Sequence, residues 1–147
     1  MPLAKEKDMK KVLIKMRGVG NAGGSKDAID FATEGTMRFD GDTVILHYTE
    51  GEMMGGNVKT RVSVTGNTVA VVERTGDIRS KLCIKKNERT SAYYSIPQGD
   101  LMLWLYGKTI KNNLTENGGT LYMSYSVDTD GVNISDNEIN ITVSEVK

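Results

Sequence analysis

The 147-residue chain contains one cysteine and one histidine, which excludes several kinds of site at once. Cys83 has no second cysteine with which to form an intramolecular disulfide. Cys83 and His47 together cannot supply the ligands of an ordinary zinc site. No G-x-S-x-G elbow provides a serine for which His47 would act as general base. We therefore expect no bound metal, no cofactor and no catalytic centre.

The chain also lacks an excess of charge and a long apolar run. Lysine plus arginine and aspartate plus glutamate are equal at 19 each, which argues against a nucleic-acid or membrane partner. The longest apolar run, residues 101–106, is far shorter than a membrane span. The charged first residues have no apolar core of a signal peptide. These features predict a cytoplasmic protein with one domain, residues 10–147, after a flexible or short helical segment, residues 1–9.

What the chain does have is alternation between apolar and polar residues, interrupted by frequent turn signals. Leu121, Met123 and Tyr125, for example, are separated by Tyr122 and Ser124. A period of two predicts antiparallel strands with one buried face and one solvated face. The strands predicted in this way are residues 10–19, 28–39, 43–50, 58–65, 68–74, 78–85, 90–96, 101–111, 120–128 and 137–145.

Nine or ten strands in meander order, without a helix of crossover length, predict an all-β fold that closes into one antiparallel up-and-down barrel. Closure removes the two exposed edges that an open meander would leave. Two packed sheets are the structural alternative. A barrel of about eight or more strands has an interior that side chains fill or that holds one small ligand.

Three segments resemble the YwiB-like proteins, a family of small bacterial calycin-type β-barrels of unknown function. The second of them contains a Tyr-Tyr-x-x-Pro-x-Gly pattern typical of that family. The segments are residues 28–35 (AIDFATEG), 91–100 (SAYYSIPQGD) and 113–125 (NLTENGGTLYMSY). The resemblance extends over roughly residues 10–146 and implies a lipocalin-like barrel. Because its motifs are turn and strand features, it implies no catalytic residues.

Residues 18–23 match the G-x-G-x-x-G pattern, in which glycines let the backbone approach a pyrophosphate at a helix N-terminus. No further β-α-β unit follows, so a glycine-rich hairpin loop at residues 20–25 is the better interpretation. His47 lies at the outward parity of its strand and is interpreted as a solvated histidine. Cys83 is interpreted as a half-buried structural thiol.

The tyrosines are the most informative polar residues. If the apolar parity of each strand faces inward, Tyr48, Tyr94 and Tyr125 face inward too, each near the end of its strand. At a barrel mouth these rings would stack on a ligand and offer hydroxyl hydrogen bonds. The alternative is that they cap a packed core, with their hydroxyls directed to water.

Residues 101–106 are apolar at both parities, unlike a strand that is solvated on one side. We expect the three leucines of this run to face the interior. The other parity then forms an outer interaction surface of Met102, Trp104 and Tyr106. We expect at least half of Trp104 to be covered, either by the N-terminal segment or by a second copy of the chain.

Two hypotheses of function follow, with an enzyme of undetected type as a less favoured third. One is a non-enzymatic binding module that holds a small apolar or amphipathic ligand in the barrel lumen. The other is a structural or protein-interaction module with a filled barrel, including a homodimer, that uses the outer face of residues 102–106. A lumen cavity near the roughly 300 Å³ lower bound for ligand pockets favours the first, and a filled core favours the second.

Overall fold

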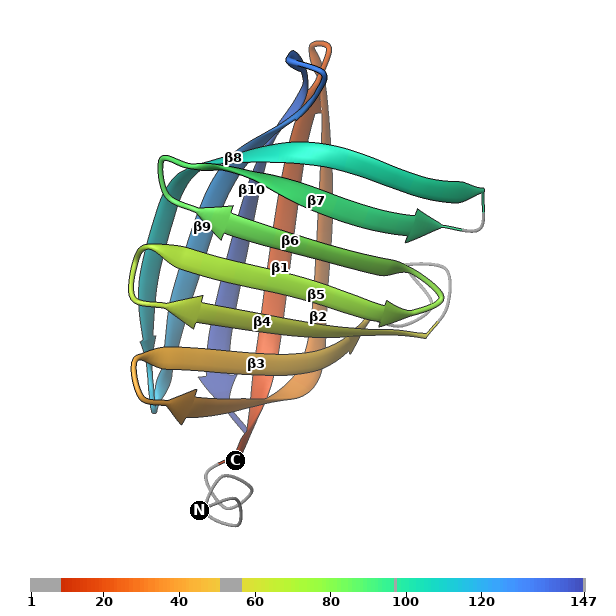
Figure 1. Cartoon of the computed structure of the whole chain (residues 1–147). Helices are drawn as coiled ribbons and strands as arrows, with labels where there is room; N and C mark the ends of the chain where they lie inside the picture. The colour runs from red at the N-terminus through yellow and green to blue at the C-terminus, as the bar shows by residue number, and fades with distance from the viewer. Residues whose placement is uncertain (1–8, 51–56, 97, 147) are drawn as a thin grey trace.

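The computed structural model describes residues 9–50, 57–96 and 98–146. Its ten antiparallel strands each pair with their neighbours in sequence, and β1 pairs with β10, so the predicted closed barrel is confirmed (Figure 1). Among the described residues, no helix is present that could cross a membrane. The strands are β1 (Lys10–Ala22), β2 (Ser25–Asp40), β3 (Thr43–Glu50), β4 (Val58–Thr65), β5 (Val69–Gly76), β6 (Arg79–Lys85), β7 (Arg89–Ile96), β8 (Gly99–Thr115), β9 (Gly118–Thr129) and β10 (Val132–Glu145).

The barrel is flattened into two layers whose strands cross at a steep angle. In Figure 1, β3 to β7 run across the front, while β1, β2, β9 and β10 run behind them from bottom to top. The 17-residue β8 belongs to both layers, because it begins beside β7 and then curves round to follow β9. An irregularity in its pairing with β9, between Gly107 and Thr109, lies within this bend.

Apolar side chains fill most of the lumen in cross-strand layers. The pairing registers of β3 to β6 align one inward residue from each strand into a layer, and the next inward residues form a second layer. The first layer is Val44, Val64, Ala70 and Ile84, and the second is Leu46, Val62, Val72 and Leu82. All eight are buried, as is expected for the alternating inward positions of a barrel.

The first hairpin is longer than the sequence predicts. The expected glycine-rich loop at residues 20–25 is wrong, because β1 continues to Ala22 and β2 begins at Ser25. Only Gly23 and Gly24 form the turn, with positive φ angles of 58° and 85°, which a tight two-residue hairpin requires. In Figure 1 this hairpin projects beyond the top of the barrel, next to the β9–β10 hairpin.

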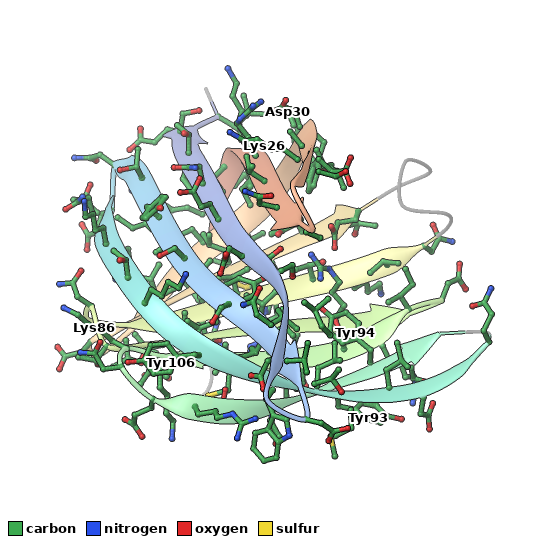
Figure 2. All side chains as sticks on the ribbon, turned by 90° about the horizontal axis from the view of Figure 1, so that it is seen from above. Lys26, Asp30, Lys86, Tyr93, Tyr94 and Tyr106 are labelled. Carbon is green, nitrogen blue, oxygen red and sulfur yellow. The ribbon has the colours of Figure 1, made fainter. Side chains whose placement is uncertain are left out.

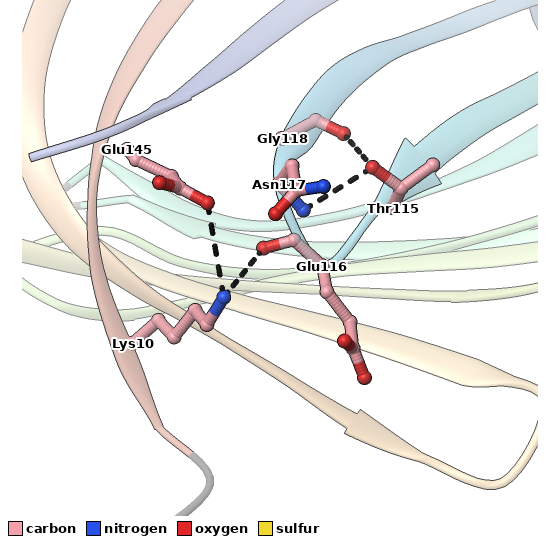
Figure 3. Close-up of polar contacts among 6 residues, drawn as sticks. All are labelled: Lys10, Thr115, Glu116, Asn117, Gly118 and Glu145. Atoms are coloured by element: carbon pink, nitrogen blue, oxygen red, sulfur yellow. Dashed lines mark hydrogen bonds and ion pairs between the residues drawn. The ribbon is translucent and has the colours of Figure 1, made fainter.

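At the other end, three segments that are distant in sequence meet where the barrel closes (Figure 3). The Lys10 ammonium group at the start of β1 donates to the carbonyl of Glu116 at 2.9 Å and lies 3.8 Å from the carboxylate of Glu145 on β10. The hydroxyl of Thr115 donates to the carbonyl of Gly118 across the β8–β9 turn. The contacts of Lys10 are exposed, so we expect them to add little to stability.

Candidate functional site

A row of polar side chains crosses five strands at one end of the lumen. The strand registers place Tyr48 of β3 opposite Thr60 of β4, Thr60 opposite Arg74 of β5, Arg74 opposite Ser80 of β6, and Ser80 opposite Tyr94 of β7. All five have the same inward parity as the apolar layers beside them. The lumen is therefore apolar through most of its depth and polar at this end.

At β7, the positions of two neighbouring tyrosines show that this row faces the lumen. Tyr94 lies on the inside of the ring of strands, whereas its neighbour Tyr93 lies on the outside (Figure 2). The ring of Phe31 on β2 packs against the ring of Tyr48, with centroids 5.9 Å apart. Aromatic side chains thus border the polar row on the β2–β3 side and on the β7 side.

A buried ion pair lies within this row. Glu50, the last residue of β3, accepts a hydrogen bond from Arg74 Nε at 2.8 Å and another from the hydroxyl of Thr60, both at Oε2. The Glu50 side chain is fully buried and that of Arg74 is 14% exposed. Removal of two charges from water is costly, and pairing with good geometry is what makes it tolerable.

Two buried atoms of this polar group have no hydrogen-bond partner among the described residues. They are Oε1 of Glu50 and the hydroxyl oxygen of Ser80. Buried polar atoms without a partner are few in native proteins, because each costs the free energy of its lost hydration. The end of the lumen therefore has hydrogen-bonding capacity that the described residues do not use.

The tyrosines at this end remain protonated at neutral pH. Burial raises the pKa of Tyr48, and the nearby Glu50 carboxylate raises it further. Burial likewise raises the pKa of Tyr94 and of Tyr125. The pKa of Arg74 is raised as well: burial opposes its charge, but the Glu50 carboxylate more than offsets that effect. The three phenols are thus neutral hydrogen-bonding groups beside a charged pair.

A cavity of about 250 Å³ opens at the same end. It connects Arg74 on the front layer with Tyr125 on the back layer. On β1, Gly18 and Gly20 have the inward parity, and Gly18 leaves space free, since a Cβ there would meet only the Met16 side chain, with Sδ at 3.7 Å. The lining consists of apolar residues, the two glycines and a few polar groups: Met16, Gly18, Val19, Gly20, Asp27, Ile29, Arg74, Tyr125, Asn137, Glu138 and Ile139.

Two larger hollows, each of about 420 Å³, are bordered mainly by outward-facing residues. One borders His47 on β3. Burial lowers the pKa of His47, and the positive charges of Arg61 and Arg38 lower it further. Its Nε2 is buried and has no partner among the described residues, so the expectation of a solvated histidine is wrong for this atom. Within residues 9–50, 57–96 and 98–146, no group of three histidine, cysteine or acidic residues is arranged to hold a metal ion.

The outer face of β8 carries the predicted apolar surface. Met102 is 65% exposed and Trp104 is 38% exposed, and Tyr106 is exposed beside them. The guanidinium group of Arg89 on β7 stacks 4.5 Å from the centre of the Trp104 ring and also forms a 2.7 Å ion pair with Asp128. More than half of the Trp104 surface is therefore covered within one copy of the chain. The N-terminal segment, which we considered as its cover, lies outside the described residues apart from its last residue.

The inner face of the same strand departs from expectation at one position. Leu105 is buried and Leu103 packs against the core, but Leu101 is 49% exposed. Leu101 lies two residues after the start of β8 and pairs with Tyr94, at the polar end of the lumen.

The structure shows where the residues of the sequence prediction lie relative to this polar end. Tyr48, Tyr94 and Tyr125, inferred from strand parity, do lie at the polar end of the lumen. Glu50 and Arg74 were missed, although the sequence held a signal. Each is a charged residue at the apolar parity of its strand, and the two charges are opposite.

The fold and the site together define a small, closed β-barrel with a packed apolar interior and a polar, hydrogen-bonding end. The chain belongs to the family described as a domain of unknown function (DUF1934), whose model matches residues 14–141. It is similar to the uncharacterized β-barrel protein YwiB of Bacillus subtilis (strain 168), with 28% identity over 116 residues, which are 79% of this chain and 80% of that protein.

The similarity extends to three dimensions. The crystal structure of the ywiB protein from Bacillus subtilis matches this fold with a TM-score of 0.78 at 25% sequence identity. The match covers 95% of this chain and 94% of the crystallised one. The resemblance to YwiB-like proteins seen in the sequence is therefore confirmed.

Proposed function

We propose that the protein is a non-enzymatic, cytoplasmic binding module that holds a small amphipathic ligand at the polar end of its lumen, as lipocalin-like barrels do. The observation that carries this proposal is the cavity between Arg74 and Tyr125, at the end of a lumen whose described apolar residues form one buried cluster. Ligand sites are typically concave, mostly apolar and equipped with a few convergent polar groups. This cavity has that composition.

The dimensions and lining of the cavity support a small ligand. Its volume of about 250 Å³ is slightly below the roughly 300 Å³ at which pockets for drug-sized molecules begin. The polar part of a ligand would contact Arg74 and Tyr125. Its apolar part would contact Met16 and Ile29, of which Ile29 is exposed on the rim in the free protein.

Native mass spectrometry of protein purified from its own host cells tests the proposal. We expect a co-purified small molecule that is released when the protein is unfolded. The variant Gly18→Val would fill the cavity without backbone strain, because Gly18 does not have a positive φ, and should lose the molecule. The control is Ala28→Val, an exposed position on the neighbouring strand opposite Val19, which should retain it. Protein without any bound molecule, or equal retention by both variants, would contradict the proposal.

The exposed apolar face of β8 favours a second candidate function, in which the protein binds a partner through Met102, Trp104 and Tyr106. Exposed aromatic residues beside an arginine are frequent anchors of protein interfaces. The same spectra distinguish the two functions, because they report the number of chains and any bound small molecule together. A dimer without a ligand would favour the second.

A further inference from the structure

Among the described residues, the buried charges at the polar end of the lumen balance each other. Arg74 and Glu50 form one ion pair, and the other described groups that influence the pKa of Arg74 are the phenols of Tyr48 and Tyr94. A ligand with a net charge would therefore bring an uncompensated charge next to the buried ion pair. Such a charge is costly, whichever its sign, because Glu50 would repel an anion and Arg74 a cation.

The carboxylates at the mouth do not change this balance. Asp27 and Glu138 border the cavity but are exposed to solvent. Glu138 already accepts a hydrogen bond from the hydroxyl of Tyr122 at 2.8 Å. Water and salt screen charges at such positions far more than they screen the buried pair.

The residues that border the cavity include both hydrogen-bond donors and acceptors. Arg74 donates from Nε to Glu50, and its two terminal nitrogens are further donors of the same side chain. Tyr125, whose hydroxyl both donates and accepts, lines the same cavity. A carboxamide accepts through its oxygen and donates through its nitrogen, whereas a carboxylate only accepts and an ammonium group only donates.

Resting on the proposed function, we propose that the ligand head group held between Arg74 and Tyr125 is uncharged and carries both a hydrogen-bond acceptor and a donor, as a carboxamide does. The apolar body of the ligand lies against Met16 and over Gly18, where the missing side chain leaves room for a flat ring or a short chain.

Three probes of nearly equal shape test the head group. Benzamide is uncharged, benzoate is an anion and benzylamine is a cation at neutral pH. Their dissociation constants are measured by nuclear magnetic resonance titration of the purified protein after removal of any bound molecule. We expect benzamide to bind at least about tenfold more tightly than either charged probe. Equal or tighter binding of benzoate or benzylamine, or binding of none of the three, overturns the head-group proposal.

The variant Glu50→Gln gives a sharper test, because it leaves Arg74 charged and uncompensated. The preference should then reverse, with benzoate binding at least about tenfold more tightly than benzamide. The control is Glu73→Gln, at the opposite parity of β5 and next to Arg74, which borders the outer hollow and should leave the wild-type preference unchanged. If Glu50→Gln does not fold, the wild-type comparison alone decides.

The failure of this proposal differs from the failure of the proposed function. If native mass spectrometry finds a bound molecule that carries a net charge, the head-group proposal is wrong while the binding module stands. If it finds no molecule, the binding module itself is wrong. A bound amide or similar uncharged molecule supports both.

Discussion

At the scale of single residues, the lumen contains a charged pair whose members depend on each other. Glu50 is fully buried, and its ion pair with Arg74 and its hydrogen bond from Thr60 replace the water that it loses. A well-packed apolar pair of the same volume would often be at least as stable as such an ion pair. Stability alone therefore does not account for charges here, which is consistent with a role in binding.

Removal of one member of the pair should be strongly destabilising. In Arg74→Met the apolar stem remains, but Glu50 loses its countercharge in a fully buried position. We expect the free energy of unfolding to fall by about 3–5 kcal/mol, the usual cost of breaking a buried pair. Urea denaturation followed by circular dichroism measures it.

Two further variants show whether the loss comes from the pair. The double variant Arg74→Met, Glu50→Gln should recover much of the stability, because no buried charge is left unpaired. Arg61→Met, at an exposed position on β4, should change stability by no more than about 0.5 kcal/mol. A loss in Arg61→Met as large as that in Arg74→Met would show that arginine truncation itself, and not the buried pair, is responsible.

At the scale of elements, β8 connects the two layers of the barrel at a close backbone contact. Gly107 exchanges hydrogen bonds with the turn after β6: its carbonyl accepts from the amide of Asn87, and its amide donates to the carbonyl of Glu88. A Cβ at Gly107 would lie 2.2 Å from the carbonyl oxygen of Lys85, which is closer than a Cβ approaches a non-bonded atom. The lack of a side chain is therefore what lets the end of β6 approach the bend of β8.

The variant Gly107→Ala should consequently force the two backbones apart. We expect a loss of about 1–3 kcal/mol in the free energy of unfolding, the range found for overpacked interiors. Gly18→Ala is the matched control, since its Cβ has room and its φ is ordinary. That variant should be neutral or up to about 1 kcal/mol more stable. Equal effects of the two substitutions in urea denaturation would contradict this account.

The elements also show what the sequence could predict. Alternation located all ten strands, and the bounds of residues 43–50 and 58–65 agree with β3 and β4. Alternation did not predict the strand ends where the composition is typical of a loop but the backbone still pairs with a neighbouring strand. Residues 20–22 and 25–27 flank a glycine turn and are mostly exposed, yet they continue the β1–β2 ladder because the partner strand satisfies their backbone groups. Residues 112–115 are polar apart from Leu114 and still extend β8 for the same reason.

The site was predictable only to the extent that parity defines it. Tyr48, Tyr94 and Tyr125 follow from the parity of their own strands. The Glu50–Arg74 pair does not, because parity arguments assign charged residues to solvent unless a partner is known. That partner lies 24 residues away and becomes evident only when the registers of β3, β4 and β5 are fixed.

At the scale of the whole molecule, closure makes the first and last strands neighbours. β1 and β10 pair over most of their length, and the core runs from them through every other strand. Because no strand is left at an edge, no strand can be detached without exposing the core on both of its sides. We therefore expect the barrel to unfold as one cooperative unit.

A substitution on β10, where this strand pairs with β1 and closes the barrel, tests this cooperativity. Ile141 on β10 is buried between Met16 on β1 and Leu121 on β9. Its replacement by alanine removes core contacts and should cost about 2–5 kcal/mol. The fluorescence of Trp104, the only tryptophan, reports from β8, whereas far-ultraviolet circular dichroism reports from all strands. In urea both signals should shift to the same lower midpoint. If the circular dichroism signal changed at a lower urea concentration than the Trp104 fluorescence, the pairing of β1 with β10 would separate on its own. Closure would then not make the barrel a single folding unit.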